Sequence, residues 1–413
     1  MKTISIFCSS LVLALSWSFS AFAHTLLVDD DRAECPGAGF TKIQAAVNAA
    51  APRDVIQVCP GIYNEQVEIA KRLTLVGIER NGKNAAVVRP SNIVINADFL
   101  GSPTAAIILV RDTSDVTIRN ITIDGINNGL VCDATAPTMD GIFFRHASGE
   151  IESVAIKNIL SPEACAFADG VDVLSTGGPH QRVTVRDSSI HDYDLGGIFC
   201  FGNGLSVSAI RNVVTGRGPT AFGQFGIQFD NGPTGTIEEN IVTNHVTADF
   251  SQSDFDSHNI GVFQAPGNTR IVRNIVGNSN VGMFVGAFPD LDSNGVTVVG
   301  NTVFNSNVLA GIFVKGNNNL VKDNTITNSG LTDAGFIHRG GVFAQGVNNT
   351  IRDNTINEAS TGLLVSTGNS ILHNWFFNTA VTTNVFVPSM TAASDQASFR
   401  QVTPRSVLRK RPR

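Results

Sequence analysis

Short apolar segments return along this chain with a spacing of 20 to 34 residues. In one half of the repeat a Gly precedes an apolar residue, a Phe and a second apolar residue. In the other half an Asn has apolar residues three positions before it and two positions after it. The first half occurs at Gly141, Gly197, Gly311 and Gly341, and the second at Asn212, Asn240, Asn274, Asn301, Asn324 and Asn354. Such a period is typical of a solenoid, in which each unit buries its apolar face against its neighbours.

The apolar segments alternate with a period of two and show no helical periodicity, which predicts two or three short strands per repeat. We therefore predict an all-β fold, a right-handed single-stranded parallel β-helix over residues 24–385. Residues 24–95 would form its N-terminal cap and first coils. Within them, residues 41–44 match a capping box, and Ile43, Ala46 and Val47 share one helical face. A short helix here would cover the open end of the first coil.

The repeated Asn and Gly are expected at turns between strands. Both tolerate left-handed backbone conformations, and stacked Asn side chains can form hydrogen bonds from coil to coil. We expect the Asn residues to hold the scaffold together rather than to act on a ligand.

Both ends of the chain differ from the repeats. Residues 1–23 combine Lys2, an apolar stretch and the sequence Ala-Phe-Ala, which predicts a signal peptide cleaved near Ala23 and a secreted or periplasmic protein. Residues 386–413 end in a run of Arg and Lys and are expected to be a flexible basic tail. No later segment has 18 consecutive apolar residues, so no membrane span is predicted. The net charge of −6, without a basic stripe, argues against nucleic acid as a partner.

Five cysteines follow the predicted signal peptide. In an oxidising compartment the expected disulfides are Cys35–Cys59 and Cys132–Cys165, with Cys200 a buried free thiol. No Cys or His group has the spacing of a zinc site, and Met is scarce, so we predict neither a metal nor another cofactor. The three consecutive Asp at 29–31 are expected to form a charged strand edge.

Aligning the repeats on their Gly places one column of residues on the outer face. The residues one and three after Gly are apolar and face inward, so the residue two after Gly faces outward. This column consists of Phe143, Asp172, Phe199, Gln228, Phe263, Phe284, Phe313, Phe343 and Leu364. Either another part of the chain covers these Phe side chains, or they form an exposed groove for a glycan or a partner protein.

Ionisable residues gather where Phe gives way to Asp172 and Gln228. Arg145 and Asp230 lie on their strands two positions after the column residue. His191 and Asp194 belong to the turn that leads into the coil between Asp172 and Gln228. Acid–base chemistry on a polysaccharide requires paired carboxylates, so Asp172 as acid and Asp194 as base are the leading pair. Asp230 and His191 complete the candidate catalytic group. The substrate-binding candidates are Arg145, Phe199, Gln228, Phe263, Phe284, Phe313 and Phe343. Solvated turn and surface residues are the alternative interpretation.

Residues 41–47, 55–63 and 73–77 resemble the opening of right-handed parallel β-helix proteins of the pectin-lyase-like superfamily, and the later Asn repeats resemble its generic repeats. This superfamily includes pectate lyases, polygalacturonases, pectin methylesterases, alginate epimerases, phage tailspikes and non-catalytic surface proteins. Residues 140–148 and 225–230 are most similar to uncharacterised secreted bacterial members. The signature motifs of the methylesterases, polygalacturonases and alginate epimerases are missing.

The resemblance implies a protein that binds a polysaccharide on its outer strand face. If it is an enzyme, it would cleave that polysaccharide as a lyase or in the manner of a glycoside hydrolase. The alternative is a non-catalytic envelope or surface protein whose Phe-lined face binds a partner protein or a second copy of itself.

Overall fold

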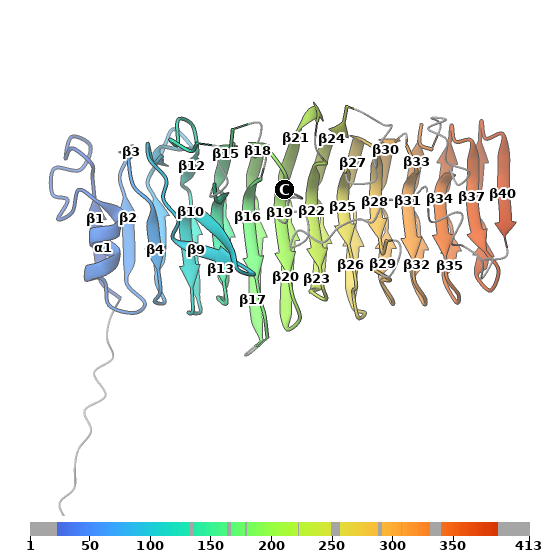
Figure 1. The fold of residues 1–413 in the computed structure, drawn as a ribbon, viewed down its shortest axis with the longest axis horizontal. Coiled ribbons are helices and arrows are strands. Elements are labelled where there is room, and N and C mark those ends of the chain that lie inside the picture. Colours follow the sequence, from blue (N-terminus) through green and yellow to red (C-terminus); the bar gives the residue numbers. More distant parts are fainter. Residues whose placement is uncertain are drawn as a thin grey trace, which may run out of the picture.

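The computed structural model describes residues 23–131, 136–162, 167–177, 180–221, 223–248, 257–287, 291–306, 308–330 and 340–386. The predicted signal peptide up to residue 22, the predicted Cys132–Cys165 disulfide and nearly all of the predicted basic tail lie outside these residues. From β2 onward, each coil contributes one strand to each of three sheets in turn. The coils stack along one axis from β1 to β40 (Figure 1).

Sheet A is parallel throughout and contains 13 strands. These are β1 (Thr25–Val28), β2 (Val55–Val58), β5 (Thr74–Gly77), β11 (Val116–Arg119), β14 (Gly149–Glu152), β17 (Gln181–Arg186), β20 (Leu205–Ile210), β23 (Thr234–Glu238), β26 (Thr269–Val272), β29 (Thr297–Val299), β32 (Leu320–Lys322), β35 (Thr350–Arg352) and β38 (Ser370–Leu372).

Sheet B follows sheet A along each coil and contains 12 parallel strands. These are β3 (Gly61–Tyr63), β8 (Ala86–Val88), β12 (Thr122–Asp124), β15 (Ala155–Ile159), β18 (Ser189–Tyr193), β21 (Val213–Thr220), β24 (Ile241–Thr247), β27 (Ile275–Ser279), β30 (Thr302–Ser306), β33 (Thr325–Thr327), β36 (Thr355–Asn357) and β39 (Trp375–Phe377).

Sheet C completes each coil. Its parallel strands are β4 (Val67–Ile69), β10 (Ser102–Arg111), β13 (Thr138–Arg145), β16 (Ala168–Leu174), β19 (Gly196–Phe201), β22 (Phe225–Asp230), β25 (His258–Val262), β28 (Val281–Val285), β31 (Ala310–Lys315), β34 (Gly340–Gln345), β37 (Thr361–Ser366) and β40 (Val381–Phe386). One further strand, β9 (Ala97–Phe99), pairs with β10 in the antiparallel direction. A separate hairpin joins β6 (Glu79–Arg80) to β7 (Lys83–Asn84).

The core is a column of apolar side chains inside the coil. In sheet A, for example, Leu75, Ile118 and Ile151 are register partners on successive strands and are all fully buried. Every coil adds one such layer, and each layer loses water only when the next coil covers it. The parallel β-helix predicted from the repeat is therefore confirmed.

The buried Asn residues form a continuous hydrogen-bonded ladder at the turn from sheet A to sheet B. The Asn301 amide Nδ2 donates to Asn324 Oδ1 (2.9 Å) and to the carbonyl of Ile271 (2.9 Å). Its Oδ1 accepts from both the backbone N (2.8 Å) and Nδ2 (3.0 Å) of Asn274. The same pattern links Asn212, Asn240, Asn274, Asn301, Asn324, Asn354 and Asn374. The scaffold role predicted for the first six of these Asn residues is confirmed, and Asn374 extends the ladder by one coil.

The left-handed backbone conformation expected at the ladder Asn lies one residue earlier. Arg211, Glu239 and Arg273 have φ values of 52°, 56° and 54°, and each directly precedes a ladder Asn. This placement points the Asn side chain into the turn, where it bridges coils, and leaves the preceding side chain outside.

Helix α1 (Ile43–Ala49) covers the first coil, as the sequence predicted (Figure 1). Ile43, Ala46 and Val47 are its buried residues. The predicted capping box is wrong, because no side chain of the helix start caps it. Glu65 does so from the loop after β3: its two carboxylate oxygens accept from the backbone N of Ile43 and of Gln44, each at 2.9 Å. A carboxylate at a helix start also complements the helix dipole.

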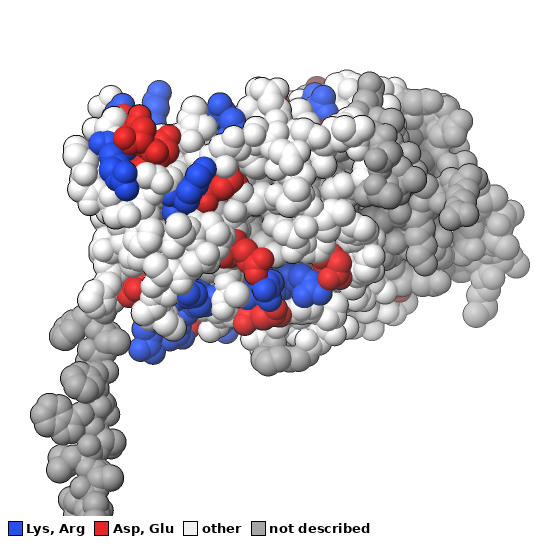
Figure 2. Space-filling view, turned by 60° about the vertical axis from the view of Figure 1, so that its left-hand side comes forward, with Lys and Arg blue, Asp and Glu red and all other residues white. Residues whose placement is uncertain are grey.

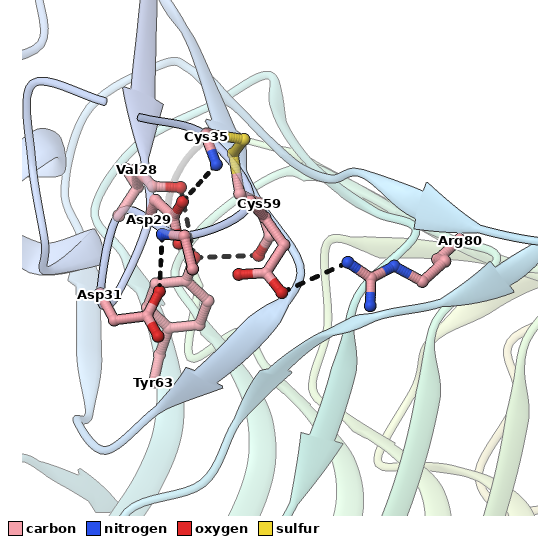
Figure 3. The surroundings of a disulfide bond; sticks show 9 residues. Val28, Asp29, Asp31, Cys35, Cys59, Tyr63 and Arg80 are labelled. Atoms are coloured by element: carbon pink, nitrogen blue, oxygen red, sulfur yellow. Dashed lines mark hydrogen bonds and ion pairs between the residues drawn. A yellow bond between two sulfur atoms is a disulfide. The ribbon is translucent and has the colours of Figure 1, made fainter. Parts of the chain in front are cut away.

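The predicted disulfide between Cys35 and Cys59 is present, with a Cα–Cα distance of 6.4 Å (Figure 3). It ties the loop after β1 to the end of β2. Cys200 is a free, buried cysteine, also as predicted. Among the described residues, no helix combines the length and the apolar character needed to cross a membrane.

Charged side chains on the outer surface lie in groups of mixed sign. On sheet A, Arg186 pairs with Glu150 and Glu152, and Arg211 pairs with Asp187 on the adjoining turns. Figure 2 shows similar mixed groups on one face of the first coils. Neighbouring coils thus neutralise one another's charges.

Replacing Asn301 tests the ladder. Asn301→Ala leaves the backbone N of Asn274 and the carbonyl of Ile271 without their partners in a buried turn, so we expect a loss of roughly 3–5 kcal/mol in the free energy of unfolding. Thr302→Ala, on the next residue and exposed, is the matched control and should cost less than about 1 kcal/mol. Equal losses in denaturant unfolding would contradict the scaffold role of the ladder.

Candidate functional site

The outer face of sheet C carries the predicted column of residues. Leu109, Phe143, Asp172, Phe199 and Gln228 are register partners on five successive strands. The strands that follow continue the column with Gly261, Phe284, Phe313, Phe343 and Leu364. The predicted column is therefore confirmed except at one position.

Phe263 is the exception, because Gly261 occupies its expected place. A Cβ atom at Gly261 would lie only 2.4 Å from His258 Nε2, so the absence of a side chain makes room for the imidazole. Phe263 instead follows the end of β25, where its backbone N donates to the carbonyl of Phe229 (2.8 Å). It lies beyond the predicted column, alongside Asp230.

The Phe side chains of this face are buried. Phe143, Phe199, Phe263 and Phe313 have no exposed surface, and Phe343 is 1% exposed. They belong to two clusters separate from the core. The first Phe cluster comprises Phe99, Ala106, Leu109, Phe143, Leu174, Leu195, Phe199, Phe201 and Phe225, and the second comprises Phe263, Val281, Phe284, Ala287, Leu291, Leu309, Ala310, Phe313, Phe343 and Leu364. An exposed aromatic groove is thus excluded, and the alternative of a covered face is confirmed.

The hairpin of β9 and β10 covers the first Phe cluster. The ring of Phe99 lies with its centre 6.0 Å from that of Phe143 and 5.7 Å from that of Phe199. Arg145, predicted to bind substrate, fastens this hairpin: its Nη2 donates to Asp98 Oδ1 (2.8 Å) and its Nε to the carbonyl of Asp98 (3.2 Å). Figure 1 shows the hairpin crossing the neighbouring strands of sheet C. Arg145 therefore holds a cover in place.

Three buried aspartate side chains lie close together on the outer face of sheet C. Asp140 and Asp169 are register partners on β13 and β16, and Asp172 follows three residues after Asp169. One carboxylate oxygen of each lies within 4.8 Å of the others, and all three side chains are fully buried. Gly196 on the next strand leaves the necessary space, because a Cβ there would lie 2.4 Å from Asp169 Oδ1. We call Asp140, Asp169 and Asp172 the acidic trio.

The sequence prediction missed Asp140 and Asp169 because it assumed strict alternation. Residues three apart on a regular strand face opposite sides. At Gly170, however, a Cβ would point inward and lie 2.5 Å from Ile190 Cγ2 in the core, next to Val171, which also faces inward. The irregularity lets both Asp169 and Asp172 face outward. The repeated Asp-Gly pair at 140–141 and 169–170 was the available signal.

The trio is suited to holding a proton or a cation. Three negative charges within this distance repel one another, and a proton or cation between them removes the repulsion. Carboxylate oxygens are also the ligands that Ca²⁺ and Mg²⁺ prefer. The arrangement can therefore serve acid–base chemistry or bind a hard metal ion.

A separate polar chain lies further along the outer face, with Phe199 between it and Asp172. Gln228 Oε1 lies 3.1 Å from His258 Nε2, and Gln228 Nε2 lies 3.5 Å from Asp230 Oδ2. Asp230 is 1% exposed, and burial raises the pKa of its carboxyl to about 7. Asp230 can therefore exchange a proton near neutral pH, which suits a general acid or base.

A second polar chain lies inside the coil next to the trio. The Tyr193 hydroxyl forms a hydrogen bond with His245 Nε2, and His245 Nδ1 lies 2.7 Å from Asn259 Oδ1. Burial, and then the charge of Asp169, raise the pKa of Tyr193. Burial lowers the pKa of His245 to about 4, so the imidazole is neutral at pH 7.

Asp194 and His191 have surroundings of their own. Asp194 accepts from the backbone N (2.7 Å) and Oγ (3.0 Å) of Ser161 and pairs with Arg217 Nη1 (2.6 Å). Burial raises the pKa of Asp194, although Ser161 and Arg217 act in the opposite direction. His191 lies on β18 of sheet B, half-exposed, with its Nδ1 2.6 Å from Asp192 Oδ2. The structure groups Asp172 with Asp140 and Asp169, whereas Asp194 binds Ser161 and Arg217, and the Asp172–Asp194 pair stays a prediction.

Comparisons with known proteins agree with this architecture. The family model described as right handed beta helix region matches residues 105–303. Together with the three parallel sheets, this match shows that the chain has the right-handed parallel β-helix fold that the predicted resemblance implied. A search of curated proteins found no match.

Solved structures of this fold are similar at low sequence identity. The A-module of a mannuronan C-5 epimerase from Azotobacter vinelandii is 15% identical, with a TM-score of 0.51 over 88% of this chain and 98% of that one. The catalytic domain of a GH87 alpha-1,3-glucanase in complex with tetrasaccharides is 14% identical, with a TM-score of 0.51 over 81% and 62%. A DFA-IIIase from Arthrobacter chlorophenolicus A6, without its lid and in complex with GF2, is 13% identical, with a TM-score of 0.50 over 90% and 100%.

Asp230→Asn should change how stability depends on pH. Because the folded-state pKa of Asp230 is raised, its carboxyl stabilises the fold fully below about pH 4, and this contribution is lost as pH rises through about 7. A shift of about 3 pKa units corresponds to roughly 4 kcal/mol. The stability of Asp230→Asn relative to the wild type should therefore increase between pH 4 and pH 8. Denaturant unfolding at both pH values, with exposed Asp112→Asn as control, checks this, and a constant difference would contradict it.

Proposed function

We propose that this protein processes a polysaccharide at the outer face of sheet C, with the acidic trio as the reacting group. The observation that carries the proposal is the approach of three buried carboxylates to within 4.8 Å on two adjacent strands. Two neighbouring carboxyl groups of the trio could divide the work: the protonated one donates a proton, while the ionised one accepts a proton or attacks the sugar. The similar structures include an epimerase, a glucanase and a DFA-IIIase, which supports a carbohydrate substrate.

The distance between the carboxyl groups of the trio limits which hydrolytic mechanism they can perform. An inverting glycosidase separates its carboxyl groups by about 6.5–9.5 Å, whereas a retaining enzyme needs about 5–5.5 Å. The trio lies nearer the shorter spacing, so hydrolysis would retain configuration. Abstraction of a ring proton, as in a lyase or an epimerase, is equally compatible with the trio. Asp230, with its raised pKa, is available as a further proton donor.

A glycan can reach the trio only when the cover moves. The β9–β10 hairpin lies over the first Phe cluster. Phe225 of that cluster lies beside Asp169, because both side chains occupy the space that a Cβ atom at Gly196 would fill. The alternative function, binding of a partner by an exposed Phe face, requires side chains that are buried here.

We also propose that the protein is secreted or periplasmic. The leader pattern of residues 1–23 supports this, as does the Cys35–Cys59 disulfide, because disulfides persist in oxidising compartments.

Substituting the trio tests the reaction. The protein is screened against mannuronan, alpha-1,3-glucan, fructan and pectate, with reducing ends, unsaturated products and changes in sugar configuration as readouts. Asp169→Asn and Asp172→Asn should each lower turnover by roughly 10²–10⁴-fold. Asp112→Asn, an exposed residue two coils away from Asp172 in sequence order, is the control and should retain activity.

Full activity in both trio variants would place the chemistry elsewhere. Absence of turnover and of binding across the whole panel would reject the carbohydrate function itself.

Arg145→Ala should loosen the cover. The Arg145–Asp98 ion pair is half-exposed, so its loss is worth about 0.2–1 kcal/mol. We therefore expect backbone amides of residues 97–99 to exchange with solvent roughly 1.5- to 5-fold faster. Arg111→Ala is the matched control, because Arg111 is the register partner of Arg145 but pairs with Glu68 and Asp112. Unchanged exchange in Arg145→Ala would show that Arg145 does not fasten the hairpin.

A further inference from the structure

A second acidic group lies at the opposite end of sheet A from β38, in the loop that follows β1. It consists of Asp29, Asp30, Asp31 and Glu34, and one carboxylate oxygen of each lies within 4.8 Å of the others. The Cys35–Cys59 disulfide holds the loop against the end of β2 (Figure 3). We call these four residues the acidic loop. The sequence predicted only a charged strand edge here, whereas the structure buries Asp29 completely.

Each carboxylate of the acidic loop uses one oxygen to fix the loop. Asp29 Oδ2 accepts from the backbone N of Cys35, and Asp30 Oδ2 from that of Ile62 (3.0 Å). Asp31 Oδ1 accepts from the backbone N of Ala33 (2.8 Å). Glu34 Oε1 lies 3.3 Å from Arg80 Nη2. These contacts position the four side chains and engage only one oxygen of each.

Asp29 Oδ1 shows that something else belongs in the loop. This oxygen is buried and has no hydrogen-bond donor among the described residues. A buried carboxylate oxygen without a partner costs several kcal/mol relative to its hydrated state. Among the described residues, the one basic side chain that pairs with the loop is Arg80, on its exposed Glu34. The buried end of the loop therefore lacks a positive partner.

Tyr63 lies beside the acidic loop. Its hydroxyl donates to the carbonyls of Cys59 (2.9 Å) and Val28 (3.2 Å), so it does not neutralise the carboxylates. Val28 and Cys59 flank the acidic loop, so the Tyr63 ring lies close enough to it to act as a probe of a bound ion.

We propose that the acidic loop binds a divalent cation, with Ca²⁺ as the preferred ion. All four ligand groups are hard carboxylate oxygens, which Ca²⁺ binds at about 2.3–2.6 Å with six to eight ligands in irregular geometry. Opposite ligands of such a shell lie about 4.6–5.2 Å apart, which accommodates a set of oxygens within 4.8 Å. Asp29 Oδ1 supplies the buried ligand, and water completes the shell on the exposed side.

The bound ion would stabilise the N-terminal cap. Asp30 already connects the loop to the start of β3 through Ile62, and the disulfide connects it to β2. A cation held by all four carboxylates would join these contacts into one rigid unit over the first coil. Ligand binding to the folded state alone raises stability with ion concentration.

Terbium luminescence can locate the ion in the protein. Tb³⁺ replaces Ca²⁺ and emits when a nearby tyrosine is excited, and this chain contains two tyrosines, Tyr63 and Tyr193. The full mature protein, freed of metal with a chelator, should give Tb³⁺ emission that Ca²⁺ suppresses. Tyr63→Phe should lose most of this emission and still gain thermal stability on addition of Ca²⁺. Tyr193→Phe, the matched control beside the acidic trio, should retain the emission.

Charge removal tests the ligands. Asp31→Asn keeps an oxygen for the Ala33 backbone N but loses the charge, so Ca²⁺ affinity measured by calorimetry should fall at least about 10-fold. Asp112→Asn should leave it unchanged. Absence of Tb³⁺ emission and of a Ca²⁺-dependent melting shift in the wild type would overturn the proposal. Loss of emission in Tyr193→Phe alone would do so as well, because it would place the ion at the acidic trio. Neither result depends on glycan turnover.

Discussion

The hydrogen bonds that buried Asn side chains exchange between coils are the constraint on which the rest of this structure depends. Within the ladder, an Asn side chain bonds the backbone of the preceding coil and the Asn side chain of the following coil, as Asn301 does with Asn274 and Ile271 on one side and Asn324 on the other. A coil of a solenoid contacts only its neighbours, so its position must be set locally. The ladder sets the register at one turn, and the three sheets carry that register around the coil. The columns of inward and outward residues follow from it.

Because the register is fixed, the local irregularity at Gly170 brings the three aspartates of the acidic trio together. Gly170 has no room for a side chain beside Ile190, and the strand therefore departs from simple alternation at this point. Asp169 and Asp172 then share the outer face with Asp140 on the previous coil. The first Phe cluster of the same face lies beneath a hairpin, and the three carboxylates beside it are fully buried. Carboxylate oxygens gathered in this way are ligands that a hard cation prefers and groups that acid–base chemistry uses.

The acidic trio and the acidic loop gather carboxylates at two different places in the fold. The acidic trio lies under a cover that Arg145 fastens, on rigid neighbouring strands, which suits chemistry on a bound substrate. The acidic loop is closed by a disulfide at the cap, where a bound cation would serve stability. Tyr193 lies beside the first group and Tyr63 beside the second.

Sequence alone determined the features that depend on periodicity: the parallel β-helix, the scaffold Asn, helix α1 and the outward column from Phe143 to Leu364. These repeat in every coil, so local patterns suffice to predict them. The single disulfide within the described residues also follows from two cysteines close in sequence. Tertiary structure decided the features that depart from the repeat. Gly261 displaced Phe263 from the column, Glu65 capped α1 from a distant loop, and Asp140 joined Asp172 through an irregular strand. Cover by the Phe99 hairpin and the burial of Asp29 likewise arise from contacts between residues far apart in the chain, which no alternation of apolar and polar residues encodes.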